Sequence, residues 1–325
     1  MKIAITGASG HIGSVLCREL IQEGYEVVAL VRNSNLSLEG LPIQFCNGNV
    51  LDKNSLKCLM EGCDAIFHVA GVIGLGYRFH QRVYDINVTG TQNILQVAKE
   101  LGIQKVVHFS SIHVFKQFPY NIPLDETRKY IEEKAIFYDK TKRDGHELAI
   151  QASKDGQDVV IVCPTGVIGP FDFQPSKLGK ATIDIYRGKF PAMIKGGFDF
   201  VDVRDVARGA IQAMKYGKSG EAYILGGRFY PLKEFAELVY KVKGKTKRFI
   251  ELPVAFAIIG LPFIQLYALL TRTKPIYDKV YLDILVDGNQ HISTEKAEKE
   301  LGYTKTSMEQ TLTDTFEWFK SRGTI

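Results

Sequence analysis

Three side chains in this 325-residue chain have the types and the spacing needed to move a proton at a carbonyl or alcohol oxygen. Tyr138 and Lys142 are four positions apart, so on a helix both side chains project from the same face. A fixed ammonium beside a phenol favours the phenolate and lowers its pKa by about one to three units, which would make Tyr138 a proton donor or acceptor. Ser111 could donate a hydrogen bond to the same substrate oxygen. Each residue alone is common on protein surfaces, and the hypothesis depends on their combination with a cofactor site.

A cofactor site is predicted at the start of the chain, where an apolar strand runs directly into three glycines. Residues 2–6 are followed by glycines in the spacing G-x-x-G-x-x-G and then by a helical pattern. Side chains at the glycine positions would block the tight turn, the approach of a pyrophosphate and close helix–strand packing. The helix N-terminus would offer free N–H groups and a positive dipole end to the phosphates. The predicted contacts in this turn are Gly7, Ser9, Gly10, His11, Ile12 and Gly13.

The residue after the second expected strand bears on the choice of cofactor. Dinucleotide sites that prefer NAD carry an acidic residue about 20 positions after the glycines, but this strand ends at Arg32. A guanidinium there would pair with a 2′-phosphate through charge-assisted hydrogen bonds. Arg32 could also be a solvated residue at a strand end, so the sequence favours NADP(H) and leaves NAD(H) open.

Two further strand ends carry candidate cofactor contacts. Asn49 and Val50 follow the third expected strand, and Ala70 and Gly71 follow the fourth. Ligands of open α/β sheets bind at the carboxyl ends of parallel strands, and the small residues would let the backbone run close to the cofactor. His68 in the fourth strand is interpreted as a packed, hydrogen-bonded core histidine without a chemical role.

Strand and helix patterns alternate through the first half of the chain. This predicts an α/β fold, a doubly wound parallel Rossmann sheet with a smaller, mostly helical C-terminal substrate lobe. The expected strands are Ile3–Thr6, Glu26–Val31, Ile43–Cys46, Asp64–Val69, Val106–Ser110, Val159–Cys163 and Ala222–Leu225. The expected helices of this half are Ile12–Glu23, Ser55–Met60, Arg82–Leu101 and Tyr138–Ala152. We expect residues 1–170 to form the dinucleotide-binding domain, with 205–228 returning to it, and residues 171–204 and 229–325 to form the substrate lobe.

Composition limits the function classes. The net charge of +5 is spread along the chain without a dense basic block, so no nucleic-acid partner is expected. The five cysteines form no C-x-x-C pair, which favours free thiols in a reducing compartment and no metal site. The N-terminus lacks the pattern of a signal peptide, and a cytoplasmic location is expected.

Residues 252–270 form a long stretch without a charged side chain. Its length approaches the roughly 20 residues that span a bilayer, but Pro253, Gly260, Pro262 and Gln265 interrupt it. A pair of short helices that line a soluble pocket is the favoured interpretation. Membrane contact through 252–270 stays open.

Taken together, the motifs resemble those of the extended short-chain dehydrogenases/reductases. The matching segments are Thr6–Gly13, Asn87–Thr91, Ser110–Ser111, Tyr138-x-x-x-Lys142, Pro164–Pro170 and Phe200–Ala207. Within that family the chain is similar to the dihydroflavonol-reductase-like group, which includes hopanoid-associated sugar epimerase-like proteins. Arg32, the segment Tyr223–Gly227 and Glu317-Trp318-Phe319 carry this second similarity.

The resemblance implies roles for particular residues. Ser111, Tyr138 and Lys142 would be catalytic, and Lys142 would also hold the nicotinamide ribose. Pro164 and Val167 would border the nicotinamide, and Ser110 and Tyr138 would also contact the cofactor. Asn87 matches a position that is more often structural than chemical. The chain departs from the family pattern at Phe115, where tyrosine is common, at Thr141, where serine is usual, and at His113 beside the expected substrate side.

Three functions remain in competition. The favoured one is an NADPH-dependent reductase of a ketone or aldehyde, with a small-molecule substrate of apolar or aromatic character. The alternatives are a nucleotide-sugar epimerase or dehydratase and a non-catalytic cofactor-sensing protein. Arg32 and the apolar stretch 252–270 favour the first, and the complete Ser/Tyr/Lys set argues against the last. The apolar substrate candidates are Phe79, Phe171, Phe173, Tyr186 and Phe198. A homodimer is common for the fold and is an open expectation.

Overall fold

A parallel seven-stranded sheet forms the centre of the molecule. The computed structural model describes residues 1–32, 36–74, 76–271 and 279–325, without the side chains of 263–271, 279 and 281. The strand order is β10-β6-β5-β4-β1-β2-β3, and all the pairings are parallel. The strands are β1 (Lys2–Thr6), β2 (Glu26–Val31), β3 (Ile43–Asn47), β4 (Ala65–His68), β5 (Lys105–Phe109), β6 (Val159–Pro164) and β10 (Ala222–Leu225). The order reverses between β1 and β4, so their carboxyl ends border a ligand-binding crevice.

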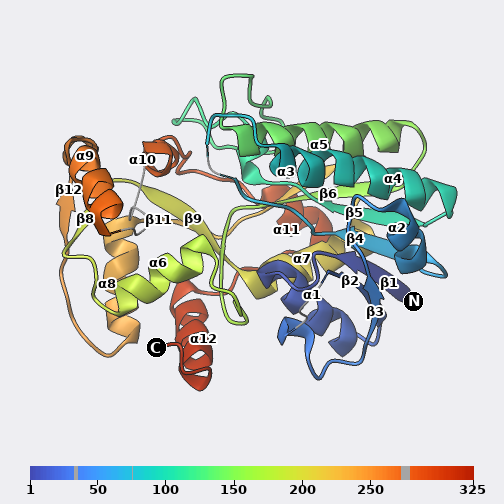
Figure 1. Cartoon of the computed structure of the whole chain (residues 1–325), viewed down its shortest axis with the longest axis horizontal. Helices are drawn as coiled ribbons and strands as arrows, with labels where there is room; N and C mark the ends of the chain where they lie inside the picture. Colours follow the sequence, from blue (N-terminus) through green and yellow to red (C-terminus); the bar gives the residue numbers. More distant parts are fainter. Residues whose placement is uncertain (33–35, 75, 272–278) are drawn as a thin grey trace.

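Helices cover both faces of this sheet, as Figure 1 shows. One core layer joins the sheet to α1 (His11–Gln22) and α7 (Val203–Tyr216). The other joins it to α2 (Lys53–Met60), α4 (Gly90–Glu100) and α5 (Phe137–Lys154). Within β1, Ile3 and Ile5 lie in the first core and Ala4 lies in the second, as side chains of a strand alternate between faces. The predicted doubly wound Rossmann sheet is confirmed.

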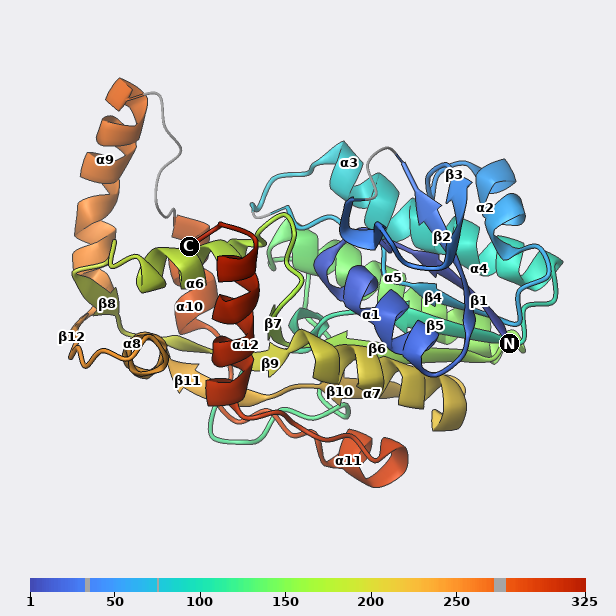
Figure 2. The same cartoon turned by 90° about the horizontal axis from the view of Figure 1, so that it is seen from below.

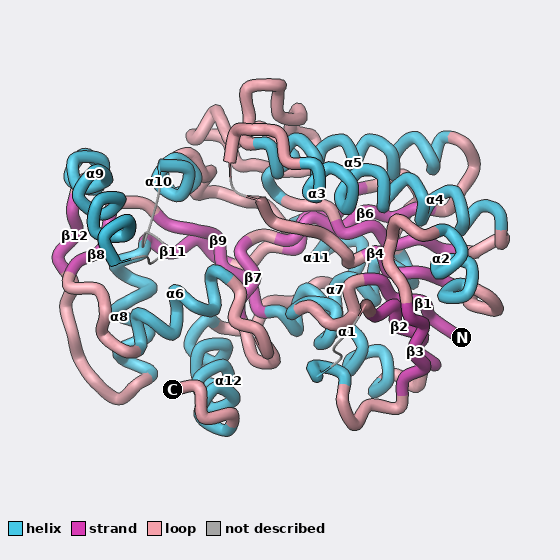
Figure 3. Tube along the Cα trace, in the orientation of Figure 1, coloured by secondary structure: helices cyan, strands magenta, loops and turns pink. Residues whose placement is uncertain are grey.

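A second group of elements packs at one end of the sheet (Figures 2 and 3). Its helices are α6 (Lys177–Tyr186), α8 (Leu232–Val242) and α12 (Met308–Ser321). They share an aromatic core in which the rings of Phe200 and Phe235 stack with centroids 4.3 Å apart. Two small sheets add to the expected helices. One contains β11 (Arg228–Pro231), β9 (Gly197–Asp202) and β7 (Gly166–Ile168), and the other contains β12 (Ile250–Leu252) and β8 (Ala192–Ile194). By contrast, α11 (Glu295–Leu301) packs on α7 and β10, beside the central sheet.

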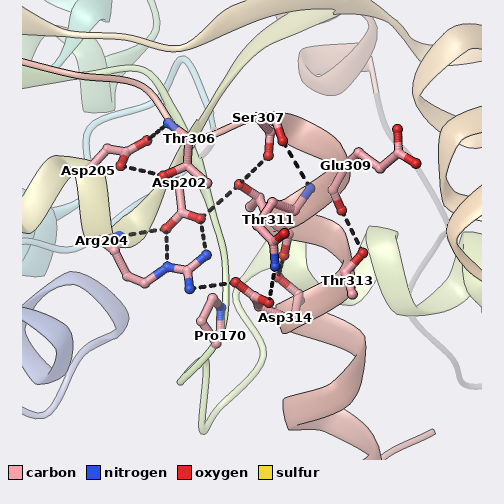
Figure 4. A network of polar contacts seen from close by, with 12 residues as sticks. Pro170, Asp202, Arg204, Asp205, Thr306, Ser307, Glu309, Thr311, Thr313 and Asp314 are labelled. Carbon is pink, nitrogen blue, oxygen red and sulfur yellow. Dashed lines mark hydrogen bonds and ion pairs between the residues drawn. The ribbon is translucent and has the colours of Figure 1, made fainter.

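Buried carboxylates fasten the C-terminal segment to the junction of β9 and α7 (Figure 4). The fully buried side chain of Asp202 accepts two hydrogen bonds from the Arg204 guanidinium and a third from Thr311 of α12 at 2.8 Å. Arg204 also donates to Asp314 at 2.6 Å. Asp205 accepts from the backbone and the hydroxyl of Thr306. The polar residues of the segment 200–207 therefore hold the C-terminal helix in place.

Two sequence expectations about helices were wrong in detail. The single helix expected over Arg82–Leu101 is divided into α3 (Gln81–Tyr84), a π-helical turn η2 (Asp85–Thr89) and α4. The stretch 252–270, expected to form two short helices, lies mostly in one helix, α9 (Val254–Thr271), which contains Pro262. It is followed by α10 (Lys279–Val286). Across the part of the chain that the structure describes, no helix is long and apolar enough to cross a membrane.

Candidate active site

The glycine turn after β1 leaves no room for side chains. Gly7 has φ +72°, and a Cβ on it would lie 2.6 Å from the backbone nitrogen of Ala70. A Cβ on Gly13 would lie 2.1 Å from the carbonyl oxygen of Gly7. Helix α1 begins after Gly10 without a side-chain cap, and Ser9 is exposed beside it. The turn thus offers uncapped N–H groups at the sheet crevice, which fits a pyrophosphate.

The other predicted cofactor contacts of this half lie at the same edge of the sheet. Arg32 directly follows β2 and is exposed, and Gly71 is exposed after β4. Asn49 is exposed, and its side-chain oxygen accepts from the backbone of Leu51 at 2.9 Å. Val50 is buried, and its side chain packs against Gly90 of α4.

His11 and Ile12, in the first turn of α1, are half-buried, and the His11 ring bonds the carbonyl of Pro170 at 3.0 Å. This contact joins the glycine turn to the loop after β7. Pro164 is the buried last residue of β6, and Val167 is half-buried in β7.

Ser111 and Tyr138 meet at the carboxyl end of β5. Ser111 follows β5, and its side-chain oxygen accepts from the backbone N–H of His113 at 3.2 Å. Tyr138, half-buried in the first turn of α5, shares a side-chain hydrogen bond with Ser111. The two groups expected to bind one substrate oxygen are therefore in contact.

Lys142 lies one helical turn farther along α5 and is buried. Its ammonium donates to the carbonyl oxygen of Phe109, the last residue of β5, at 2.5 Å. A Cβ on Gly71 would lie 3.9 Å from this Nζ atom. Ala70 lies against Gly7 of the glycine turn, and the next residue, Gly71, lies near Lys142. The backbone at Ala70 and Gly71 therefore connects the predicted pyrophosphate site to the predicted catalytic residues.

The electrostatics differ from the sequence expectation. Burial, and next the charge of Asp139, raise the pKa of the Tyr138 phenol, and only the hydrogen bond with Ser111 opposes them. The expectation that Lys142 lowers this pKa is wrong, because the phenol loses more by leaving water than it gains from its neighbours. Burial also lowers the pKa of Lys142 to about 8. At neutral pH the phenol is protonated, and the lysine is mostly charged.

Asn87, in the π-helical turn η2, connects the segment after β4 to helix α5. The Asn87 side chain accepts from the N–H of Val72 at 2.9 Å and donates to the Val72 carbonyl and to the Thr141 hydroxyl at 3.0 Å. Gly145 lets α5 approach this turn, because a Cβ there would lie 2.8 Å from the Asn87 carbonyl oxygen. The sequence signal for this contact was a glycine inside a helix, which is costly unless close packing requires it.

Ser110 points into the protein core. Its hydroxyl bonds His146 at 2.8 Å, and His146 bonds the Tyr130 hydroxyl at 3.1 Å. His68 lies between Thr6 and Thr91, at 2.8 and 3.0 Å, as a hydrogen-bonded core histidine. Burial lowers the pKa of His146 to about 4 and that of His68 to about 3, so both are neutral at pH 7.

His113 and Asp139 flank the Ser111–Tyr138 contact. Burial raises the pKa of the Asp139 carboxyl, and the charge of His113 opposes this rise. Both side chains are half-buried. They are the ionisable neighbours of the site that the motif pattern did not assign.

The five apolar substrate candidates do not gather in one place. Phe79 is exposed, and its ring packs on Phe137, the residue before Tyr138, with centroids 5.1 Å apart. Phe171 and Phe173 pack on Trp318 of α12. Tyr186 packs on Phe316, and Phe198 packs on Phe200, both within the aromatic core. Only Phe79 lies beside the predicted catalytic residues.

Comparisons with known proteins agree with this architecture. Residues 3–226 match the NAD dependent epimerase/dehydratase family. The chain is 33% identical to a putative dihydroflavonol 4-reductase of Synechocystis, covering 99% of this chain and 95% of the relative. It is 29% identical over the full length of both chains to the sterol demethylase protein B of Methylococcus capsulatus. The solved structure of gox2253 superposes with a TM-score of 0.85 at 27% identity, covering 100% of this chain and 99% of the other.

These matches confirm the resemblance to an extended short-chain dehydrogenase/reductase of the dihydroflavonol-reductase-like group. They also indicate an enzyme of the NAD(P)-dependent oxidoreductase type. The chain belongs to the NAD dependent epimerase/dehydratase family.

Proposed function

We propose that this protein is an NADPH-dependent reductase that converts an apolar ketone or aldehyde to its alcohol. The contact between Ser111 and Tyr138, one turn before a buried Lys142, carries the proposal. NADPH, which the glycine turn and Arg32 would hold, would supply the hydride for the carbonyl carbon. Tyr138 donates its phenolic proton to the carbonyl oxygen, so that hydride and proton together complete the alcohol.

The protonation state of Tyr138 is compatible with a role as general acid. A phenol whose pKa is raised by burial carries the proton that a general acid must deliver. Ser111 donates a hydrogen bond to the substrate oxygen and keeps it in line with the phenol. Lys142, buried one helical turn farther along α5, would hold the nicotinamide ribose.

NADPH is proposed over NADH because of Arg32. It is exposed at the carboxyl end of β2, where an NAD-binding chain would carry a carboxylate. Its guanidinium is suited to a 2′-phosphate. The names of the dihydroflavonol reductase and sterol demethylase relatives, and the exposed Phe79 next to Phe137, favour a substrate with an apolar or aromatic body.

The proposal is tested by following the oxidation of NADPH, with NADH in parallel, against aromatic ketones, aldehydes, ketosteroids and sugar nucleotides. We expect consumption of NADPH with an aromatic or steroidal carbonyl compound. Tyr216→Phe, an exposed site on α7, serves as the control for a substitution outside the site. Conversion of a sugar nucleotide without net consumption of NADPH would instead establish an epimerase or dehydratase.

A further inference from the structure

Helix α9 is apolar on every side, yet part of it is exposed. Residues 254–259 are Val, Ala, Phe, Ala, Ile and Ile, and the whole helix contains no charged residue. One side of its first turns packs on Leu282 of α10 and on Ile194 of β8. On the outer side, Phe256, Ile258 and Ile259 are 61%, 53% and 67% exposed. A helix in water normally has a polar outer face, and one that is apolar all round is normally buried in protein or in lipid.

The helix stands at the end of the molecule that lies away from the central sheet (Figure 2). In the contacts among described elements it packs on α10, and three exposed large apolar side chains stand within two turns. Isolated exposed apolar residues are ordinary, but a gathered group marks an interaction surface. Exposure of this outer face of α9 to water is therefore unfavourable, and burial of its side chains in a binding partner would lower the free energy.

A run of basic residues precedes α9 in the chain. The segment 241–248 contains Lys241, Lys243, Lys245, Lys247 and Arg248, and it leads through β12 into the helix. Lys245 and Arg248 are exposed. Lys195 is also exposed, and its backbone N–H donates to the carbonyl oxygen of Leu252, the last residue of β12, at 2.8 Å. Lys241 is paired with Glu309, and the Glu237 carboxylate accepts from the backbone N–H of Phe249 at 3.2 Å. Further acidic residues are Glu251, exposed in β12, and Asp283 of α10.

We propose that the outer face of α9 inserts into the interface of an anionic lipid bilayer, with Lys195, Lys245 and Arg248 on the phospholipid headgroups. An apolar helix face beside a basic segment is the combination that binds such surfaces. A second copy of the chain fits this face less well. In a symmetric dimer the same patch meets itself, and the cations of both copies would repel. The proposal does not depend on the reaction that the enzyme catalyses.

The experiment measures co-sedimentation of the full chain with vesicles of phosphatidylcholine, with and without phosphatidylserine. We expect binding to the vesicles with phosphatidylserine that weakens as salt is added. The double variant Phe256→Ser/Ile259→Ser should bind about 100-fold more weakly, because two large side chains no longer enter lipid. Lys245→Gln/Arg248→Gln should lose about fivefold per cation, and on vesicles with phosphatidylserine only.

Control variants change comparable exposed residues elsewhere on the molecule. Tyr216→Ser removes an exposed aromatic residue from α7, and Lys99→Gln/Lys154→Gln removes two exposed cations from the ends of α4 and α5. These variants should bind like the wild type. Because the serine variant could fold poorly, Phe256→Trp provides a second measurement, a blue shift of its fluorescence on addition of anionic vesicles.

Absence of wild-type binding to anionic vesicles would overturn the proposal. So would equal binding by the Phe256→Ser/Ile259→Ser variant. A wild-type dimer in solution that the same substitutions convert to a monomer would assign the face to a second copy of the chain and would also overturn it.

Discussion

Replacing Lys142 by methionine should stabilise the cofactor-free protein while it abolishes turnover. The ammonium is buried, and burial lowers its pKa from 10.5 to about 8. The folded-state pKa is below the unfolded value, so the charged lysine destabilises the fold by about 3 kcal/mol at pH 7. Methionine has a similar length and no charge, but the hydrogen bond to Phe109, worth about 1 kcal/mol, is lost. The net gain is about 2 kcal/mol, or about 3 °C in melting temperature.

The pH dependence of the melting temperature distinguishes removal of a buried charge from an improvement in packing. The destabilisation by the lysine is fully present below about pH 8 and disappears as the pH rises through 10.5, the unfolded value. The assay is thermal unfolding of wild type and Lys142→Met without cofactor, near neutral pH and near pH 10. Lys99→Met, at an exposed site on α4, is the control and should not change the melting temperature. A lower melting temperature for Lys142→Met at neutral pH, or a gain that does not shrink with rising pH, would refute the reasoning.

Three further changes probe the cofactor site and the core. Arg32→Ala should weaken NADPH binding by about 10- to 100-fold and leave NADH binding nearly unchanged in a titration, and equal losses would exclude the 2′-phosphate contact. Gly7→Ala should weaken both cofactors alike, since its Cβ would meet Ala70 at 2.6 Å; unchanged affinity for both would show that the turn does not form the site. His108 is buried with neither ring nitrogen hydrogen-bonded to a described residue, so His108→Phe should raise the free energy of unfolding by about 1 to 2 kcal/mol. Because burial lowers the pKa of His108, that gain should grow below about pH 6.5, whereas the exposed control His291→Phe should show neither effect in denaturant melts.

The parts of the fold that depend on local patterns were predictable. Most strands of the central sheet are short, largely apolar runs, and the glycine turn is specified by sterics within a few residues. Tyr138 and Lys142 share a helix, so their spacing alone placed them on one side.

Other features depend on contacts between distant segments. The π-helical turn around Asn87 forms where its side chain bonds Val72 and Thr141, and no periodicity signals it. The direction of the Tyr138 pKa was mispredicted because the spacing showed the lysine but not the burial of the phenol. Helix α9 continues through Pro262, which sequence rules would place at a helix boundary.

The most direct test of the proposed chemistry is the turnover of Tyr138→Phe with a carbonyl substrate and NADPH. This substitution removes the phenolic hydroxyl that contacts Ser111 and retains the ring. We expect turnover to fall by about 10² to 10⁴-fold, while the NADPH dissociation constant stays within about twofold of wild type. Turnover close to wild type in this variant would show that another group delivers the proton.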